Sequence, residues 1–319
     1  MPKYKEGQIT MSLQTKPLYI ITAGSTYLDI DAYACAVSLA ELLQLKGENA
    51  IAYSTAIANY SVTSSLADDS RLLNNLPLDF REQEASYIIV DVSDPDYIKD
   101  SVPLDRIVAV YDHHVGFEEY WTSRIGENTH IEFIGAAATL IYREWKREEL
   151  QHQMSPATAR LLVAAILDNT LNLTSSNTTE EDREAFNELC RIAGVGSEFR
   201  ALYFSEVQKS VEADLKNALL GDLKTLRDTK VLPPKIAQLC VWDAHGIFAH
   251  LPDIRAWLGG NGAWMLNLIS LEEGCSYFLC DDAQYQTNIE TVFDVRFENG
   301  VAKSPVSYLR KQIIKKAYF

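Results

Sequence analysis

Apolar positions in the first half of the chain follow two alternating patterns. Short runs rich in β-branched residues have the length of buried strands and lie at 18–22, 49–53, 87–90, 107–111 and 130–134. Apolar residues at helical spacing occupy 32–45, 136–146 and 157–167. Strands that alternate with helices form parallel sheets, because each crossover helix returns the chain to the same edge. We therefore predict an α/β fold whose main domain is a doubly wound, mostly parallel sheet.

The helical pattern is interrupted near residue 194. Thr179 and Asp182 fit a capping box, with Thr179 as the N-cap of a helix over 180–193. Glycines then break the pattern, and we predict a linker over 194–203. The chain is long enough for two domains, each with its own core. We predict a larger domain and a second, smaller α/β domain, at 1–195 and 204–319.

The second domain contains weaker signals. A helix is predicted over 215–226, and strand-like runs occur at 235–242 and 291–297.

Composition narrows the classes of partner. The 319 residues are 47% apolar and 23% charged, as in ordinary soluble proteins. A formal net charge of −15 argues against a broad nucleic-acid surface, because phosphate backbones require basic patches. A small anionic substrate stays open, since bound divalent cations reverse the local field. Five scattered cysteines favour a reducing compartment, and neither a membrane span nor a signal peptide is evident. We expect a cytoplasmic protein without membrane or long nucleic-acid partners.

Acidic and imidazole side chains gather where the predicted strands end, the edge at which open α/β sheets bind ligands. The set is Asp29, Asp31, Asp91, Asp112, His113, His114 and, after the helical segment at 157–167, Asp168. Taken singly, each Asp also fits turn or N-cap duty, and the His pair fits a satisfied polar cluster. Together, carboxylates with imidazoles suit Mn²⁺, Mg²⁺ or Co²⁺. The pattern therefore favours a site for two divalent cations, which activate water and bind phosphoryl oxygens.

At these motifs the chain resembles the DHH phosphoesterase superfamily. The likeness is closest to the branch of family II inorganic pyrophosphatases and prune-like exopolyphosphatases. Further segments that resemble motifs of this branch lie at 166–182, 221–224 and 310–313. The resemblance implies an interdomain active-site cleft with two divalent cations, Mn²⁺ foremost, and Mg²⁺ or Co²⁺ as alternatives. The metal ligands that it implies are Asp29, Asp31, Asp91, His113 and Asp168.

The same resemblance implies how substrate is held. His114 and Asp112 would be catalytic, with His114 facing the substrate and stabilising or protonating a phosphoryl oxygen. Lys224, Arg310 and Lys311 would clamp the distal phosphate from the second domain. A polyanion requires such cations, and Arg offers a bidentate fork. A solvated basic tail is the alternative interpretation of Arg310 and Lys311.

Three positions depart from the pyrophosphatase pattern. Ser25 stands where a His ligand is usual, Leu309 where the first Arg of the basic signature is usual, and Val115 where a basic residue follows the His pair. A hydroxyl ligates less well than an imidazole, so one metal site should be weaker or more hydrated.

We predict a metal-dependent phosphohydrolase that cleaves phosphoanhydride bonds of pyrophosphate or short-chain polyphosphate. Two alternatives remain: a small-nucleotide phosphodiesterase, and a degenerate, non-catalytic member that binds a phosphorylated ligand or a partner protein. A homodimer is also compatible with the sequence.

Overall fold

The computed structural model describes residues 17–26, 28–68, 71–76, 85–226, 230–260 and 262–318, without the side chain of Lys311. The polar leader expected at 1–16 lies outside the described residues.

The first sheet has six strands in the order β3-β2-β1-β4-β5-β6. Every neighbouring pair is parallel, which confirms the predicted sheet. The carboxyl ends of all six strands therefore point toward one edge. The strands are β1 Leu18–Thr22, β2 Asn49–Tyr53, β3 Leu72–Leu73, β4 Ala85–Val90, β5 Ile107–Asp112 and β6 Thr129–Ile131.

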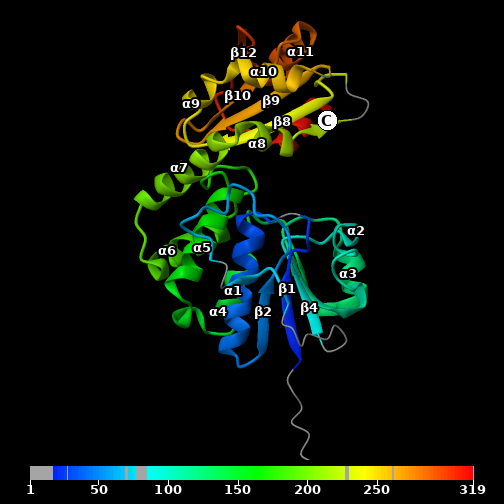
Figure 1. Cartoon of the computed structure of the whole chain (residues 1–319), viewed down its shortest axis with the longest axis vertical. Helices are drawn as coiled ribbons and strands as arrows, with labels where there is room; N and C mark the ends of the chain where they lie inside the picture. The colour runs from blue at the N-terminus through cyan, green and yellow to red at the C-terminus, as the bar shows by residue number, and fades with distance from the viewer. Residues whose placement is uncertain are drawn as a thin grey trace, which may run out of the picture.

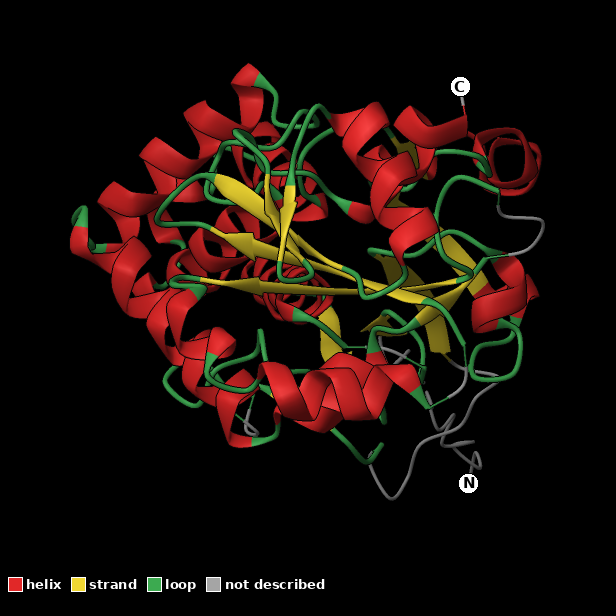
Figure 2. Cartoon of the chain, turned by 90° about the horizontal axis from the view of Figure 1, so that it is seen from above, coloured by secondary structure: helices red, strands yellow, loops and turns green. Residues whose placement is uncertain are grey.

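Helices cover both faces of this sheet, as expected for a doubly wound fold (Figures 1 and 2). In β4, Ile88 and Val90 belong to the core on the side of α1, while Tyr87 and Ile89 belong to the core with α2 and α3. Each buried residue of this kind stabilises the fold by roughly 1.5–3 kcal/mol. One face carries α1 Ile30–Leu45, α4 Ala137–Arg147, α5 Pro156–Asn169 and α6 Glu180–Ala193; the other carries α2 Pro95–Ile98 and α3 Glu118–Ile125.

Helix α7, Glu198–Ala213, leads from the first sheet to the second (Figure 1). The second sheet has the order β11-β12-β10-β9-β8-β7, and only its β8–β9 pair is parallel. Its strands are β7 Lys224–Thr225, β8 Lys235–Val241, β9 Trp264–Ser270, β10 Cys275–Leu279, β11 Phe297–Glu298 and β12 Val301–Lys303. Its helices are α8 Leu215–Gly221, α9 His245–Phe248, α10 Leu251–Gly259, α11 Ala283–Phe293 and α12 Arg310–Tyr318.

Three local predictions in this second half were wrong. Helix α7 begins at Glu198, inside the predicted linker. Helix α8 ends at Gly221, and strand β7 occupies part of the segment predicted as helix over 215–226. The predicted strand at 291–297 contains the end of helix α11 up to Phe293 and a turn, and only Phe297 lies in a strand; Asp282 caps the helix by accepting from Gln284 N and Tyr285 N. The cap outweighs the β-branched composition of the segment. The domain bounds 1–195 and 204–319 stay a prediction.

All five cysteines are free thiols. Among the described residues, no helix combines the length and the apolar character that crossing a membrane requires.

Candidate metal centre

The sheet order reverses between its two central strands, β1 and β4. From β1 the chain builds outward through β2 and β3, whereas β4 starts the other half with β5 and β6. Ligands of doubly wound sheets bind in the crevice at such a reversal, outside the carboxyl ends of the strands. Asp29 follows β1 and Asp91 follows β4 directly, so the two acids flank this crevice.

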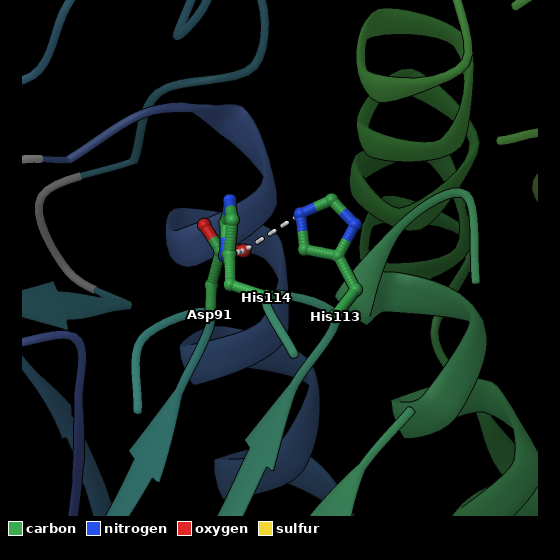
Figure 3. Close-up of side chains that lie close together, drawn as sticks. All are labelled: Asp91, His113 and His114. Atoms are coloured by element: carbon green, nitrogen blue, oxygen red, sulfur yellow. Dashed lines mark ion pairs between the residues drawn. The ribbon is translucent and has the colours of Figure 1, made fainter. Parts of the chain in front are cut away.

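Asp91, His113 and His114 form a group at this edge whose ligand atoms all lie within 4.8 Å of one another (Figure 3). The Oδ1 atom of Asp91 lies 3.5 Å from His113 Nε2 and 4.0 Å from His114 Nδ1. The side chains of Asp91 and His113 are each 6% exposed, whereas that of His114 is 64% exposed. Asp91 also has a left-handed backbone, with φ of 58°, which Asp tolerates better than most residues. This turn aims its carboxylate at the two imidazoles.

Backbone and side-chain acceptors fix the orientation of both rings. His113 Nδ1 lies 3.2 Å from the carbonyl oxygen of Ile134, which directs Nε2 toward Asp91. His114 Nδ1 lies 2.8 Å from Asp112 Oδ1, which also accepts from the backbone N–H of His114. Such outer contacts select the tautomer and orient a ligating imidazole. Asp112 itself is fully buried and positions His114 rather than facing solvent.

Asp29 and Asp31 both use their carboxylates at helix starts. Asp29 is the N-cap of α1, and its Oδ1 accepts from Asp31 N and Ala32 N, each at 3.0 Å. Asp31 is buried, and its two oxygens accept from Ala137 N and Ala138 N at the start of α4, each at 2.8 Å. The capping interpretation of these residues is therefore satisfied in the structure. It is compatible with ligation, because an ionised carboxylate has about four acceptor positions.

Asp168 lies near the end of α5 and contacts the helix that leads to the second sheet. Its Oδ1 atom accepts a hydrogen bond of 2.9 Å from the hydroxyl of Tyr203 on α7. Burial and, to a smaller extent, the charge of Asp29 raise the pKa of Asp168 to about 7, although the Tyr203 hydrogen bond acts in the opposite direction. Asp168 thus belongs to the same electrostatic group as Asp29.

We call Asp29, Asp31, Asp91 and Asp168 the acidic cluster. Burial raises the pKa of Asp91 well above its usual range, and the charges of Asp29, Asp31 and Asp112 add to the rise. Burial, and then the charge of Asp29, raise the pKa of Asp31 to about 7. Within the described part of the chain, no Lys or Arg forms an ion pair with these acids, and the buried Oδ1 of Asp91 has no hydrogen-bond partner. Buried carboxylates without a counter-charge are costly. The donor set of oxygens and imidazole fits divalent cations such as Mn²⁺.

In the predicted phosphate clamp, Arg310 already forms an ion pair with Asp222. Arg310 Nη1 donates to Asp222 Oδ2 at 2.6 Å, and Nη2 donates to Oδ1 at 3.1 Å, with the Arg310 side chain only 11% exposed. Lys224 is exposed on β7. Lys311 belongs to α12, and its side chain lies outside the described residues.

The pKa values of two further groups, Tyr60 and Cys240, depend on charges at the site. Burial raises the pKa of the Tyr60 hydroxyl, and the charges of Asp222 and Asp168 raise it further. Burial also raises the pKa of the Cys240 thiol on β8, and Asp168 adds to that rise. Both groups therefore lie within electrostatic range of Asp168.

Comparison with known proteins bears on the resemblance that the motifs indicated. No family model matches the chain. A protein of Staphylococcus carnosus is 28% identical over 91% of this chain and 97% of its own length, and one of Exiguobacterium sp. is 25% identical over 92% and 96%. Both carry the name "Probable manganese-dependent inorganic pyrophosphatase". The chain is thus similar over nearly its whole length to proteins of that name. The resemblance predicted from the motifs is thereby confirmed.

Solved structures of two proteins share the fold of this chain. A candidate family II inorganic pyrophosphatase of Methanococcus jannaschii superposes with a TM-score of 0.61 at 20% identity, covering 94% of this chain and 98% of that one. An exopolyphosphatase-related protein of Bacteroides fragilis gives 0.52 at 13% identity, covering 95% and 91%. At these identities the likeness concerns the fold.

The chain also has features that its motifs did not predict. Ser25, where a His ligand was expected, is exposed. Asp222 lies in the recognised 221–224 motif, but that motif did not indicate its pairing with Arg310. Tyr203, which contacts Asp168, and Ser61, whose carbonyl oxygen lies against the Tyr203 hydroxyl, carry no sequence signal, because only the packing of distant segments joins them.

Proposed function

We propose that the protein is a manganese-dependent phosphohydrolase that cleaves the phosphoanhydride bond of pyrophosphate or short-chain polyphosphate. The observation that carries the proposal is the acidic cluster beside His113 and His114, largely buried at the reversal of the sheet without a Lys or Arg partner among the described residues. Relatives of similar length named as manganese-dependent pyrophosphatases support it.

The ligands in this proposal are the acidic cluster and His113. Their oxygens and one imidazole nitrogen can hold two divalent cations, with Mn²⁺ expected and Mg²⁺ or Co²⁺ as alternatives. Such ions supply Lewis acidity at the phosphoryl group and a water of lowered pKa. Asp91 would bridge the two positions, because its carboxylate lies between the His pair and Asp29. Backbone N–H groups at helix starts already orient Asp29 and Asp31. Binding a cation would therefore require little further loss of side-chain freedom.

His114 is the residue that we assign to substrate. Its hydrogen bond to Asp112 turns Nε2 away from the protein, and its high exposure suits a group that meets a ligand. In hydrolysis, water adds to phosphorus, the bond to the bridging oxygen breaks, and that oxygen receives a proton. His114 Nε2 would hold a proton for a phosphoryl oxygen, and Asp112 would stabilise the imidazolium.

The second sheet supplies the cationic side of the site in this proposal. Lys224, Arg310 and Lys311 would contact the distal phosphate, and Asp222 would hold the Arg310 fork in place. Cations that approach from the second sheet and acids from the first place the substrate in an interdomain cleft. The homodimer stays a prediction.

Orthophosphate release tests the proposal. Wild type is assayed with pyrophosphate, tripolyphosphate, long-chain polyphosphate and a dinucleotide, each with Mn²⁺, Mg²⁺ or Co²⁺. We expect turnover of pyrophosphate with Mn²⁺, and a loss of about 100-fold or more in Asp91→Asn, because ligands and their supports carry metal affinity and activity. Asp96→Asn, at an exposed acid of α2, is the matched control and should equal wild type.

The panel also separates the alternatives. Release from the dinucleotide alone would replace the proposal with phosphodiesterase activity. Mn²⁺ binding without release from any substrate would indicate the non-catalytic member of the superfamily.

A further inference from the structure

Tyr203 is a buried aromatic residue on α7 whose hydroxyl reaches two parts of the metal centre. Its side chain is 2% exposed. The hydroxyl oxygen lies 2.9 Å from Asp168 Oδ1 and 3.1 Å from the carbonyl oxygen of Ser61. These acceptors come from segments far apart in the sequence. Tyr203 therefore joins them from a third segment.

The hydroxyl has one proton for two acceptors. A carbonyl oxygen only accepts, and a ligating carboxylate is ionised and also only accepts. Hydrogen bonds to an ionised acceptor are shorter and stronger than those to a neutral one. When Asp168 binds a metal ion, the Tyr203 hydroxyl therefore donates its proton to Asp168 rather than to Ser61. The shorter of the two distances, 2.9 Å to Asp168, agrees with this assignment. Donation to one oxygen of Asp168 fixes the rotation of the carboxylate.

Ser61 extends the contact to the other side of the centre. Its Oγ accepts from the backbone N–H of Ile30 at 2.9 Å and donates to Asn59 Oδ1 at 2.6 Å. Ile30 is the residue between Asp29 and Asp31. The chain of contacts thus runs from the start of α1 through Ser61 and Tyr203 to Asp168.

The position of Tyr203 depends on the second sheet. Phe204, the next residue on α7, stacks on Trp242 at the end of β8, with ring centroids 6.1 Å apart. Tyr203 itself packs against Phe204 at 5.0 Å and stacks on Phe199 at 6.4 Å. A displacement of α7 relative to β8 would move the hydroxyl that holds Asp168.

We propose that Tyr203 is a positioning residue of the metal centre, whose hydroxyl orients Asp168 by donating its one proton to Oδ1. The proposal rests on the metal-dependent function proposed above. Outer hydrogen bonds of this kind account for roughly 10- to 100-fold of metal affinity when they are removed. Tyr203 does not touch the substrate in this role, so it governs metal affinity rather than the Michaelis constant.

Tyr203→Phe isolates the hydroxyl, since it keeps the ring and its packing. The matched control is Tyr142→Phe. Tyr142 is also buried, at 1% exposure, and its hydroxyl donates to a carboxylate, Glu188 Oε2, at 2.8 Å. Glu188 is not a proposed ligand. Mn²⁺ is titrated into the metal-free full chain by calorimetry, without substrate, and circular dichroism checks that each variant is folded.

We expect Tyr203→Phe to weaken Mn²⁺ binding by roughly 10- to 100-fold and Tyr142→Phe to leave it unchanged. At saturating Mn²⁺, the Michaelis constant of Tyr203→Phe for pyrophosphate should stay within about twofold of wild type. Equal Mn²⁺ affinity in Tyr203→Phe and wild type would overturn the role of Tyr203 and leave the proposed function standing. Equal weakening in both variants would also overturn it, since loss of a buried hydroxyl anywhere would then suffice. A wild type that binds no Mn²⁺ would instead remove the proposed function itself.

Discussion

The two sheets hold their carboxylates in opposite ways. At the edge of the first sheet, the acidic cluster is buried, and its pKa values are raised by burial and mutual repulsion. In the second sheet region, acids contact a cation instead. Asp222 pairs with Arg310 at 2.6 Å, and Glu273 pairs with Lys303 at 2.7 Å. Hydrogen bonds from Lys303 and then Tyr277 lower the pKa of Glu273 to about 2.

This contrast separates charges that stabilise the chain from charges that oppose folding. A paired acid favours the folded state, whereas buried acids that repel one another oppose it unless a proton or a ligand neutralises them. Functional sites commonly lower stability in this way. In the proposed function, cations would compensate the acids of the first sheet, whereas Asp222 and Glu273 in the second region already pair with basic side chains. Substitutions of the same chemical kind should then have opposite effects in the two places.

The largest effect on stability is expected for Asp222→Asn. Asn keeps the shape of Asp but not its charge, so the bidentate pair with Arg310, which is 11% exposed, is lost. Hydrogen bonds to charged groups contribute about 1.5–3 kcal/mol, and we expect the free energy of unfolding to fall by about 2 kcal/mol. Urea unfolding of metal-free protein measures this change. Asp253→Asn, at an exposed acid of α10, is the control and should change it by less than about 0.5 kcal/mol. An unchanged midpoint in Asp222→Asn would show that the pair is not structural.

A smaller effect is expected for Lys224→Ala, and on substrate affinity. Lys224 is exposed on β7, so its removal should leave folding and Mn²⁺ affinity unchanged. The loss of one charge-assisted contact to phosphate should raise the Michaelis constant for pyrophosphate about tenfold, equivalent to about 1.4 kcal/mol. Steady-state kinetics at saturating Mn²⁺ measures it, with Lys216→Ala on the exposed side of α8 as control. A Michaelis constant equal to that of wild type would exclude Lys224 from the clamp.

Much of the first sheet could be predicted from the sequence, because its signals are local. Strands β1 and β2 have the predicted bounds, and the Thr179–Asp182 capping box forms as predicted. In these segments, buried strands and caps depend on the residues themselves. The second region was harder, since β-branched residues at the end of α11 favour strand locally while the Asp282 cap and the core contact of Phe293 favour helix.

The site shows the same division between local and distant information. Acids that follow parallel strands must meet at one edge, so the position of Asp91 beside His113 could be anticipated. The contact between Tyr203 and Asp168 could not, because it depends on how α7 packs after the chain has left the first sheet. The pairing of Arg310 with Asp222 likewise joins residues 88 positions apart.

The smallest effect, and the sharpest test of the contrast, is expected for Asp91→Asn in metal-free protein. Removing this charge relieves repulsion with Asp29, Asp31 and Asp112, and Asn tolerates the left-handed backbone at this position. We expect the metal-free variant to be more stable than wild type by about 1 kcal/mol, within the usual gain from relieving a strained functional site. Added Mn²⁺ should raise the melting temperature of wild type, since a ligand that binds only the folded state stabilises it, and should leave that of the variant unchanged. Thermal unfolding with and without Mn²⁺ measures both differences. If Asp91→Asn instead destabilised the metal-free chain, as Asp222→Asn should, the two sets of acids would be structural alike and the contrast between the sheets would fail.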